Sequence, residues 1–303
     1  RIQAAMDELN YVRDGVARSL TSRRSQSIGV IVPVLGTAVY AQAVEAIERR
    51  LQVDRHQLLI GCSGYDPQRE YELARALVEQ GVDGLIVVGS SHAPGFFDLL
   101  ERARIPVVQT FATYQDSVLP CVGFDNYTPM YELTEFLIGL GHRKFAVLHS
   151  HLRNNDRISA RYEGIMQALA AHGIAPDRDL VREVGYTIAD GRAGLRGLLA
   201  AGRDFTALAC TGDVLSVGVL IEAKARGIEI PGRFSVTGFH DHELAAHMEP
   251  PLTTVHAPVA EMGVAAAQYL LSRLNGGNPP HTYELPTSLV VRKSVGPPRP
   301  AVA

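Results

Sequence analysis

The sequence has few cysteines and no long apolar run, and each shortage excludes a class of protein. Its three cysteines, Cys62, Cys121 and Cys210, are an odd number, and each stands in an apolar or small-residue stretch typical of a strand. We therefore expect buried thiols rather than the disulfide framework of a small secreted domain. No apolar run is long enough to span a membrane and no signal peptide is visible, so we expect a cytoplasmic protein without membrane contacts.

The sequence also lacks an excess of positive charge. Among 303 residues, 29 Lys and Arg against 32 Asp and Glu give a net charge of −3, so most of the surface does not suit nucleic acid. Residues 1–24 depart from that balance, because they hold five arginines against three acidic residues. That local bias favours a DNA-facing end on a body whose 46% hydrophobic residues can form a sizeable core.

The motifs of common enzymes are also absent. No Gly-x-Gly-x-x-Gly follows the first predicted strand, and neither a Gly-x-x-x-x-Gly-Lys-Ser/Thr loop nor a Gly-x-Ser-x-Gly elbow occurs. His240, His242 and His247 lie close in sequence, with His149 and His151 on a neighbouring predicted strand. No further Cys, His or carboxylate stands at metal-ligand spacing. We therefore expect neither an enzyme nor a metal site, and no cofactor.

Strands and helices alternate along nearly the whole chain. Near-continuous apolar strands such as 84–88 indicate burial on both faces, as in parallel sheets. The predicted fold class is therefore α/β, with two doubly wound parallel-sheet lobes in tandem. The predicted strands are 28–34, 56–62, 84–88, 106–110, 145–149, 207–210, 234–239 and 288–292, and the predicted helices are 40–51, 68–80, 95–103, 130–140, 159–172, 193–201, 215–226 and 259–274.

Polar and aromatic side chains gather in the loops that follow the predicted strands. Ligands of such folds lie at the carboxyl ends of the strands, in the cleft between the lobes. A polyhydroxylated ligand needs planar polar groups for its hydroxyls and an aromatic face for its apolar side. The sequence therefore predicts a site for a small hydroxylated molecule among the loops at 37–40, 64–66, 90–92, 125–126, 155–161, 212–213 and 240–242.

The first 33 residues contain the most informative pattern. The end of a helix over 1–9 precedes a very short helix over 16–20, two arginines and a buried strand over 27–33. This segment resembles the hinge of the lactose-repressor/galactose-repressor (LacI/GalR) family of bacterial transcription factors, in which a helix-turn-helix headpiece comes first. The resemblance implies that residues 1–24 are the end of a truncated headpiece followed by its hinge helix.

In that family the paired hinges of a dimer enter the minor groove of DNA. The residues that match its wedge are Ala17 and Leu20, and those placed to contact phosphates are Arg18, Arg23 and Arg24. An apolar wedge inserted between base steps unstacks the DNA and bends the duplex, which lets more of the protein touch DNA. The pattern departs at Arg13, where the family usually has proline, so the entry to the hinge is expected to be less rigid.

The family's core is similar to the type I periplasmic-binding-protein fold, in which the chain crosses three times between two lobes. The resemblance implies crossings near Asp125, His256 and Leu285. The expected division is an N-terminal effector-binding lobe from 27–125 plus 257–284, a C-terminal lobe from 126–256 plus 285–295, and a Pro-rich disordered tail over 296–303.

Four positions carry the comparison with the family's effector site. Arg161 matches the arginine that reaches the effector from the second lobe, because its fork of donors suits paired hydroxyls or a carboxylate; alone, it would pass for a surface arginine on a helix. Asp125 matches a cleft aspartate, and its alternative role is to cap the following helix. His240 and Gly212 stand where most members have an aspartate and an asparagine. Loss of that carboxylate favours an anionic effector, which the carboxylate would repel.

Residues 238–243, 248–250 and 122–126, together with His92, are similar to the corresponding parts of gluconate-operon repressors, a branch of the family. This resemblance implies gluconate or a related aldonate as effector, with Arg161 and His240 nearest its carboxylate. The predicted effector-binding residues are Tyr40, Tyr65, His92, Asp125, Arg161, Asp213 and His240.

The resemblance implies a homodimeric repressor of a carbohydrate catabolic operon. It would bind operator DNA through headpieces and hinges, and effector closure of the cleft would release the DNA. Two alternatives share the fold: a solute-binding protein of a sugar transporter, and a regulator that senses a neutral sugar. The hinge pattern and the free cysteines favour the regulator.

Overall fold

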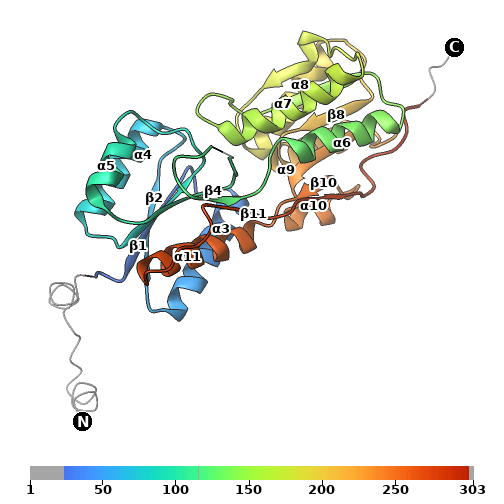
Figure 1. Ribbon diagram of the computed structural model, residues 1–303. Coiled ribbons are helices and arrows are strands. Elements are labelled where there is room, and N and C mark those ends of the chain that lie inside the picture. The colour runs from blue at the N-terminus through green and yellow to red at the C-terminus, as the bar shows by residue number, and fades with distance from the viewer. Residues whose placement is uncertain (1–23, 115, 300–303) are drawn as a thin grey trace.

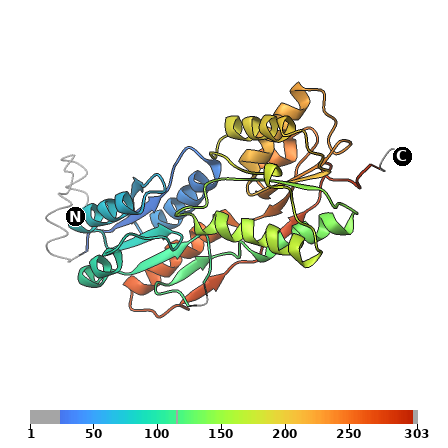
Figure 2. The same cartoon turned by 90° about the horizontal axis from the view of Figure 1, so that it is seen from above.

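The computed structural model describes residues 24–114 and 116–299, which form two α/β lobes (Figure 1). The described chain begins at the outer end of the first lobe and finishes at the outer end of the second (Figures 1 and 2). No helix within the described ranges is long and apolar enough to cross a membrane. The predicted fold class is confirmed, since each lobe contains a mainly parallel sheet with helices on both faces.

The sheet of the first lobe has six parallel strands in the order β11-β5-β4-β3-β1-β2. Successive apolar residues of β1 point to opposite faces, so Ile28 and Val30 join one core cluster and Ile31 joins another. The strands are β1 (Ser27–Val32), β2 (Gln57–Cys62), β3 (Gly84–Val88), β4 (Val107–Thr110), β5 (Cys121–Gly123) and β11 (Thr282–Glu284).

Two pairs of helices cover this first sheet. Helices α3 (Ala38–Val53) and α11 (Val259–Leu274) pack against one another on one face. Helices α4 (Pro67–Glu79) and α5 (Phe96–Ala103) contribute to the smaller core on the other face. Both faces of the central strands are thereby buried, which explains why β3 consists of apolar residues after its glycine.

The second sheet repeats this plan in the order β12-β10-β9-β8-β6-β7, and only β12 runs antiparallel to its neighbour. Helices α6 (Thr128–Gly139) and α7 (Asp156–Ala171) cover one face, and α8 (Ile188–Ala200) and α9 (Asp213–Ala225) cover the other. The strands are β6 (Phe145–His149), β7 (Val181–Glu183), β8 (Ala207–Cys210), β9 (Ser235–His240), β10 (Thr253–His256) and β12 (Ser288–Val290).

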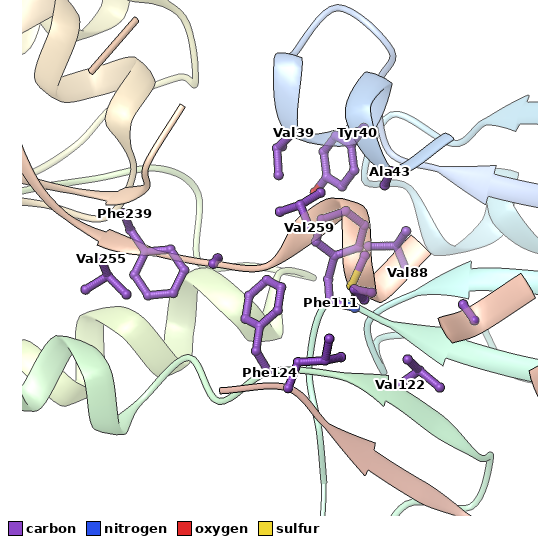
Figure 3. Close-up of a cluster of buried hydrophobic side chains, with 14 of the residues drawn as sticks. Val39, Tyr40, Ala43, Val88, Phe111, Val122, Phe124, Phe239, Val255 and Val259 are labelled. Atoms are coloured by element: carbon purple, nitrogen blue, oxygen red, sulfur yellow. Dashed lines mark hydrogen bonds between the residues drawn. The ribbon is translucent and has the colours of Figure 1, made fainter. Parts of the chain in front are cut away.

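The chain passes between the two sheets three times: after β5, after β10 and after β11. A row of buried aromatic rings lies across this junction (Figure 3). Ring centroids are 5.0 Å apart for Tyr40 and Phe111, 6.2 Å for Phe111 and Phe124, and 6.3 Å for Phe124 and Phe239. We call these four residues the aromatic row. It joins the core beneath α3 to the core beneath α6 without a break.

Several short elements were not predicted from the sequence, namely β5, β7, β10, β11, the helix α10 (Glu243–His247) and a 3₁₀ turn at Arg178–Leu180. Most helices begin within two residues of their predicted start, and α7 and α8 begin earlier by a larger margin. Helix α8 starts at Ile188 because Thr187 and Asp190 form a reciprocal capping box. Helix α7 starts at Asp156 because the Asn155 side chain accepts a hydrogen bond from the Ile158 amide.

The predicted tail has partners on the second lobe in its described part. The carbonyl oxygen of Gly296 lies 2.9 Å from His142 Nε2 and accepts a hydrogen bond from Ser235 Oγ at 3.0 Å. Arg299 forms an ion pair with Glu229. All three cysteines are free, and Cys62 is only partly buried.

Candidate functional site

A cleft of about 830 Å³ lies between the lobes at the carboxyl ends of the strands. The first lobe contributes the loops after β1 and β2, and the second contributes the loops after β6, β7, β8 and β9. Its polar lining includes Thr37, Tyr65, Ser150, His151, Arg153, Asn155, Tyr186, Thr187, Asp213 and His242. The remaining wall is largely apolar and comes from both lobes, with Val34, Ala38, Ile188, Val214, Val217 and Leu244.

A smaller hollow of about 20 Å³ lies deeper between the lobes. Tyr65, Asn155 and Tyr186 line both the cleft and this deep hollow. The hollow has room for about one water molecule or one small polar group. The other side chains around it are Val39, Tyr40, Phe111, Arg157, Ile158, Arg161 and His240.

Arg161, on α7, is fully buried beside the deep hollow and has only neutral hydrogen-bond partners. Its Nε donates to Asn126 Oδ1 at 2.8 Å, one terminal nitrogen donates to the Thr211 carbonyl at 3.0 Å, and the other lies 3.0 Å from His240 Nε2. The guanidinium also lies 3.8 Å from the ring centre of Phe239. Burial, together with the positive charge of nearby Arg157, lowers the pKa of Arg161 to about 10. Within the described ranges Arg161 forms no ion pair.

His240 accepts a hydrogen bond from Arg161, because a guanidinium can only donate. The Nε2 atom must therefore be unprotonated, and the ring proton lies on Nδ1. Burial, the positive charge of Arg161 and neighbouring His242 all hold the pKa of His240 well below its ordinary value. Nδ1 is buried and has no hydrogen-bond partner among the described residues. His240 also has a φ of 116°, a strained backbone that turns the end of β9 at the site.

Two tyrosines form the polar part of the first-lobe wall of the deep hollow. The hydroxyl oxygens of Tyr40, on α3, and Tyr65, after β2, are 3.3 Å apart. Burial, together with the nearby Tyr40 hydroxyl, raises the pKa of Tyr65, so the phenol stays protonated. Tyr186 stands opposite in the second lobe, and its buried hydroxyl has no partner among the described residues.

Asp213 starts α9 and lines the cleft, yet its carboxylate is buried and already bonded. It accepts hydrogen bonds from Thr254 Oγ1 at 2.6 Å and from the His242 amide at 2.9 Å. Burial raises the pKa of Asp213, while the Thr254 bond works in the opposite direction.

The structure places two predicted residues outside the lining of the cleft and the deep hollow. His92 is buried in the first lobe, where its Nδ1 lies 2.7 Å from a Glu70 carboxylate oxygen and its ring stacks on Phe96. Asp125 accepts hydrogen bonds from the Tyr127 and Thr128 amides at the start of α6, which is the capping role weighed as its alternative. An effector contact by either residue stays a prediction.

The hinge prediction falls mainly outside the described residues, which do not include Ala17, Arg18, Leu20 and Arg23. Arg24 is described, and it donates a hydrogen bond to the Leu274 carbonyl at the end of α11.

Sequence reasoning did not single out Arg157, Tyr186 or Asn126, all of which lie at or beside the deep hollow. The loops containing Arg157 and Asn126 were recognised as facing the cleft. The segment 153–157 is uniformly polar before a helix, which was the available signal. No cluster of three His, Cys, Asp or Glu side chains suited to a metal ion occurs in the described part of the chain.

Comparison with known proteins identifies the family. Residues 134–295 match the periplasmic binding protein-like domain. The HTH-type transcriptional regulator GntR of Escherichia coli K12 is 32% identical over 284 residues, covering 91% of this chain and 82% of that protein. The ribose operon repressor of Haemophilus influenzae is 29% identical and covers 97% of this chain and 89% of its own length.

Solved structures of similar fold are also those of transcription regulators. The transcription regulator GntR of Chromobacterium violaceum superposes with a TM-score of 0.84 at 32% identity, covering 88% of this chain and 98% of that one. A LacI family regulator of Silicibacter pomeroyi gives a TM-score of 0.81 at 26% identity, covering 89% and 98%. A complex of the transcriptional regulator CelR with cellobiose gives 0.78 at 27% identity, covering 97% and 89%.

These relatives are transcription regulators, so the expectation that the chain is not an enzyme is confirmed. They also favour a regulator over the solute-binding protein considered as an alternative. The family resemblance seen in the sequence is confirmed over nearly the whole chain, and the protein belongs to the LacI family of transcriptional regulators.

Proposed function

We propose that the protein is an effector-responsive repressor whose interlobe site binds a sugar acid such as gluconate. The observation that carries this proposal is the unpaired charge of Arg161. A buried guanidinium whose partners are an amide, a carbonyl and an imidazole has lost its hydration without gaining a counter-charge. A carboxylate in the deep hollow would supply that counter-charge.

The charge balance of the hollow supports one negative charge on the effector. Arg157 already pairs with Asp156, at 2.6 Å between Nη1 and Oδ1. Asp213 lines the cleft and not the hollow, and burial raises the pKa of its carboxyl group, which disfavours the charged form. His240 adds no charge, because its pKa lies well below the ordinary value. Arg161 is therefore left as the single uncompensated charge among the groups that line the hollow.

Unpartnered polar atoms around the cleft suit the hydroxyls of such a molecule. Thr37 Oγ1, Tyr186 Oη and His242 Nε2 are buried, line the cleft and have no hydrogen-bond partner among the described residues. Each would cost free energy if it stayed unsatisfied, so a ligand rich in hydroxyls gains from bonding them. The tyrosine rings offer an apolar face to the carbon skeleton.

The regulatory part of the proposal rests on the family. We infer a cytoplasmic homodimer that binds operator DNA through hinges and headpieces, with effector capture changing the arrangement of the lobes. An effector can shift that arrangement only by its differential affinity for the two states, typically about 1–3 kcal/mol of coupling.

Calorimetry tests the effector class. We expect gluconate to bind the wild-type protein and glucose, its neutral counterpart, to bind much more weakly. Arg161→Ala should weaken gluconate binding by roughly 2–4 kcal/mol, because the anion loses its charged partner. Tight binding of a neutral sugar with no binding of aldonates would rule out a sugar acid as the effector.

A neutral sugar is the second possibility, favoured by the relative that holds cellobiose. His240→Asp separates the two, because it places a carboxylate against Arg161 and neutralises the charge that an anion would need. If the effector is a sugar acid, this variant should lose affinity for gluconate by about tenfold or more. If the effector is neutral, its affinity for that sugar should be kept or improved.

A further inference from the structure

Asp156, the first residue of α7, connects the two lobes beside the deep hollow. Its Oδ2 atom accepts hydrogen bonds from the Ser90 amide at 3.0 Å and from Ser90 Oγ at 3.1 Å. Ser90 follows β3 in the first lobe, whereas Asp156 belongs to the second. One carboxylate oxygen therefore holds two donors across the gap.

The other carboxylate oxygen holds Arg157. Its Nη1 donates to Asp156 Oδ1 at 2.6 Å, and the side chains are only 6% and 15% exposed for Arg157 and Asp156. Burial alone would lower the pKa of Arg157, but the Asp156 carboxylate and the Tyr40 and Tyr65 hydroxyls hold it above its ordinary value. The guanidinium therefore stays charged inside the junction of the lobes, where it lines the deep hollow.

The first lobe provides a socket for this guanidinium at Gly89. A Cβ atom at position 89 would lie 1.8 Å from Arg157 Nη1 and 2.6 Å from Asp156 Oδ1, so both side chains would have to move to admit it. The backbone of Gly89 also has a φ of 76°, in the region that favours glycine. Gly89 and Ser90 thus receive the Arg157 and Asp156 pair, and we call these four residues the interlobe clasp.

We propose that Asp156 is a positioning residue that holds the lobes together before the effector arrives and fixes Arg157 in the wall of the deep hollow. The ion pair is largely buried, the two Ser90 bonds lie at the protein surface, and all three contacts form without a ligand. The effector would then enter a site whose second-lobe cations are already in place. The part of this inference that concerns effector affinity rests on the proposed function.

Preorganisation has a calculable effect. When only a fraction of the protein is in the binding-competent arrangement, the apparent dissociation constant rises by the inverse of that fraction. Breaking the clasp should lower this fraction, because the closed state loses the two Ser90 hydrogen bonds to a charged carboxylate, which are the bonds that cross between the lobes. Loss of Asp156 should therefore weaken effector binding although Asp156 lines neither the cleft nor the deep hollow.

Hydrogen exchange of the protein without ligand tests the clasp directly. The Ser90 amide is bonded to Asp156, so Asp156→Ala should speed exchange in peptides spanning residues 88–92. Asp98→Ala is the matched control, since Asp98 is also an acidic residue in the first turn of a helix, α5, and is solvent-exposed. Unchanged exchange in Asp156→Ala would show that nothing holds the lobes at this point.

Gluconate titration tests the coupling. Asp156→Ala should bind gluconate about tenfold or more weakly than Asp98→Ala, as a reduced competent fraction requires. Faster exchange with unchanged gluconate affinity would overturn the role of Asp156 in effector binding. If the wild-type protein binds no sugar acid, the proposed function fails, and the exchange measurement still decides whether the clasp closes the lobes.

A glycine pair gives a second route that leaves Asp156 in place. Gly89→Ala puts a methyl group into the Arg157 socket and should reproduce both effects of Asp156→Ala. Gly95→Ala is the matched control, because Gly95 has a φ of 83° and the nearest atom to its added Cβ is 3.9 Å away. Both substitutions place alanine at a positive φ, so the two variants share that backbone strain. Equal exchange and equal gluconate affinity in the two would show that Gly89 does not make room for Arg157.

Discussion

His240 shows how one neutral, buried side chain makes stability depend on pH. Its folded-state pKa lies well below the ordinary value, while in the unfolded chain it titrates normally. As the pH falls below about 6.5, His240 binds a proton in the unfolded state but not in the folded state, so the stability of the fold decreases. Burial also lowers the pKa values of His142, His149 and His242, and these act in the same direction.

The variant His240→Gln should therefore reduce the loss of stability between pH 7 and pH 5.5. A glutamine can still accept the hydrogen bond from Arg161 but does not titrate. We expect the fall in unfolding free energy over this interval to be smaller by about 1 kcal/mol than in the wild type. Urea denaturation at both pH values measures the difference, and identical losses in the two proteins would contradict a neutral His240.

At the residue scale, sequence reasoning placed Arg161, which matches the family's pattern, close to His240, which departs from it. The structure has the two side chains in contact, and their nearness to an effector stays a prediction of sequence reasoning. Sequence reasoning failed to single out Arg157, because an arginine beside an aspartate at a helix start is also an ordinary surface pattern. Only tertiary packing shows that Gly89 opens a socket for it.

At the scale of elements, the start of α8 depends on the capping box formed by Thr187 and Asp190. Thr187→Ala removes the acceptor for the Asp190 amide and should cost about 1 kcal/mol of stability. Thr37→Ala is a matched control, because Thr37 stands at the same position before α3 but its side chain makes no capping bond. Chemical denaturation compares the unfolding free energies of the two variants. Equal losses would show that the capping box does not stabilise the start of α8.

The long elements were predictable and the short ones were not. Strands β1 and β3 and helices α7, α9 and α11 carry strong apolar patterns, because both faces of each sheet are covered. By contrast, β7 and β11 are edge strands of only three residues, none of them fully buried, so no apolar period marks them. Three glycines within α8 weakened its helical pattern, and its early start followed from the cap.

At the scale of the whole molecule, the hinge and the effector site are expected to be separable. In a chain that carries the DNA-binding headpiece, Leu20→Ala should lower operator affinity, because the proposed wedge between base steps loses its side chain. Effector affinity should stay unchanged, since the cleft lies between the lobes. Operator binding by fluorescence anisotropy and effector binding by calorimetry check the two halves, and undiminished operator affinity would argue against the wedge.

The aromatic row has a consequence for how the molecule comes apart. Because Tyr40, Phe111, Phe124 and Phe239 form part of one apolar core that extends into both sheets, neither lobe can melt without exposing rings packed against the other. Heating should then produce one calorimetric endotherm, with equal van't Hoff and calorimetric enthalpies per cooperative unit. A fold built from two similar halves would behave in this respect as a single thermodynamic body.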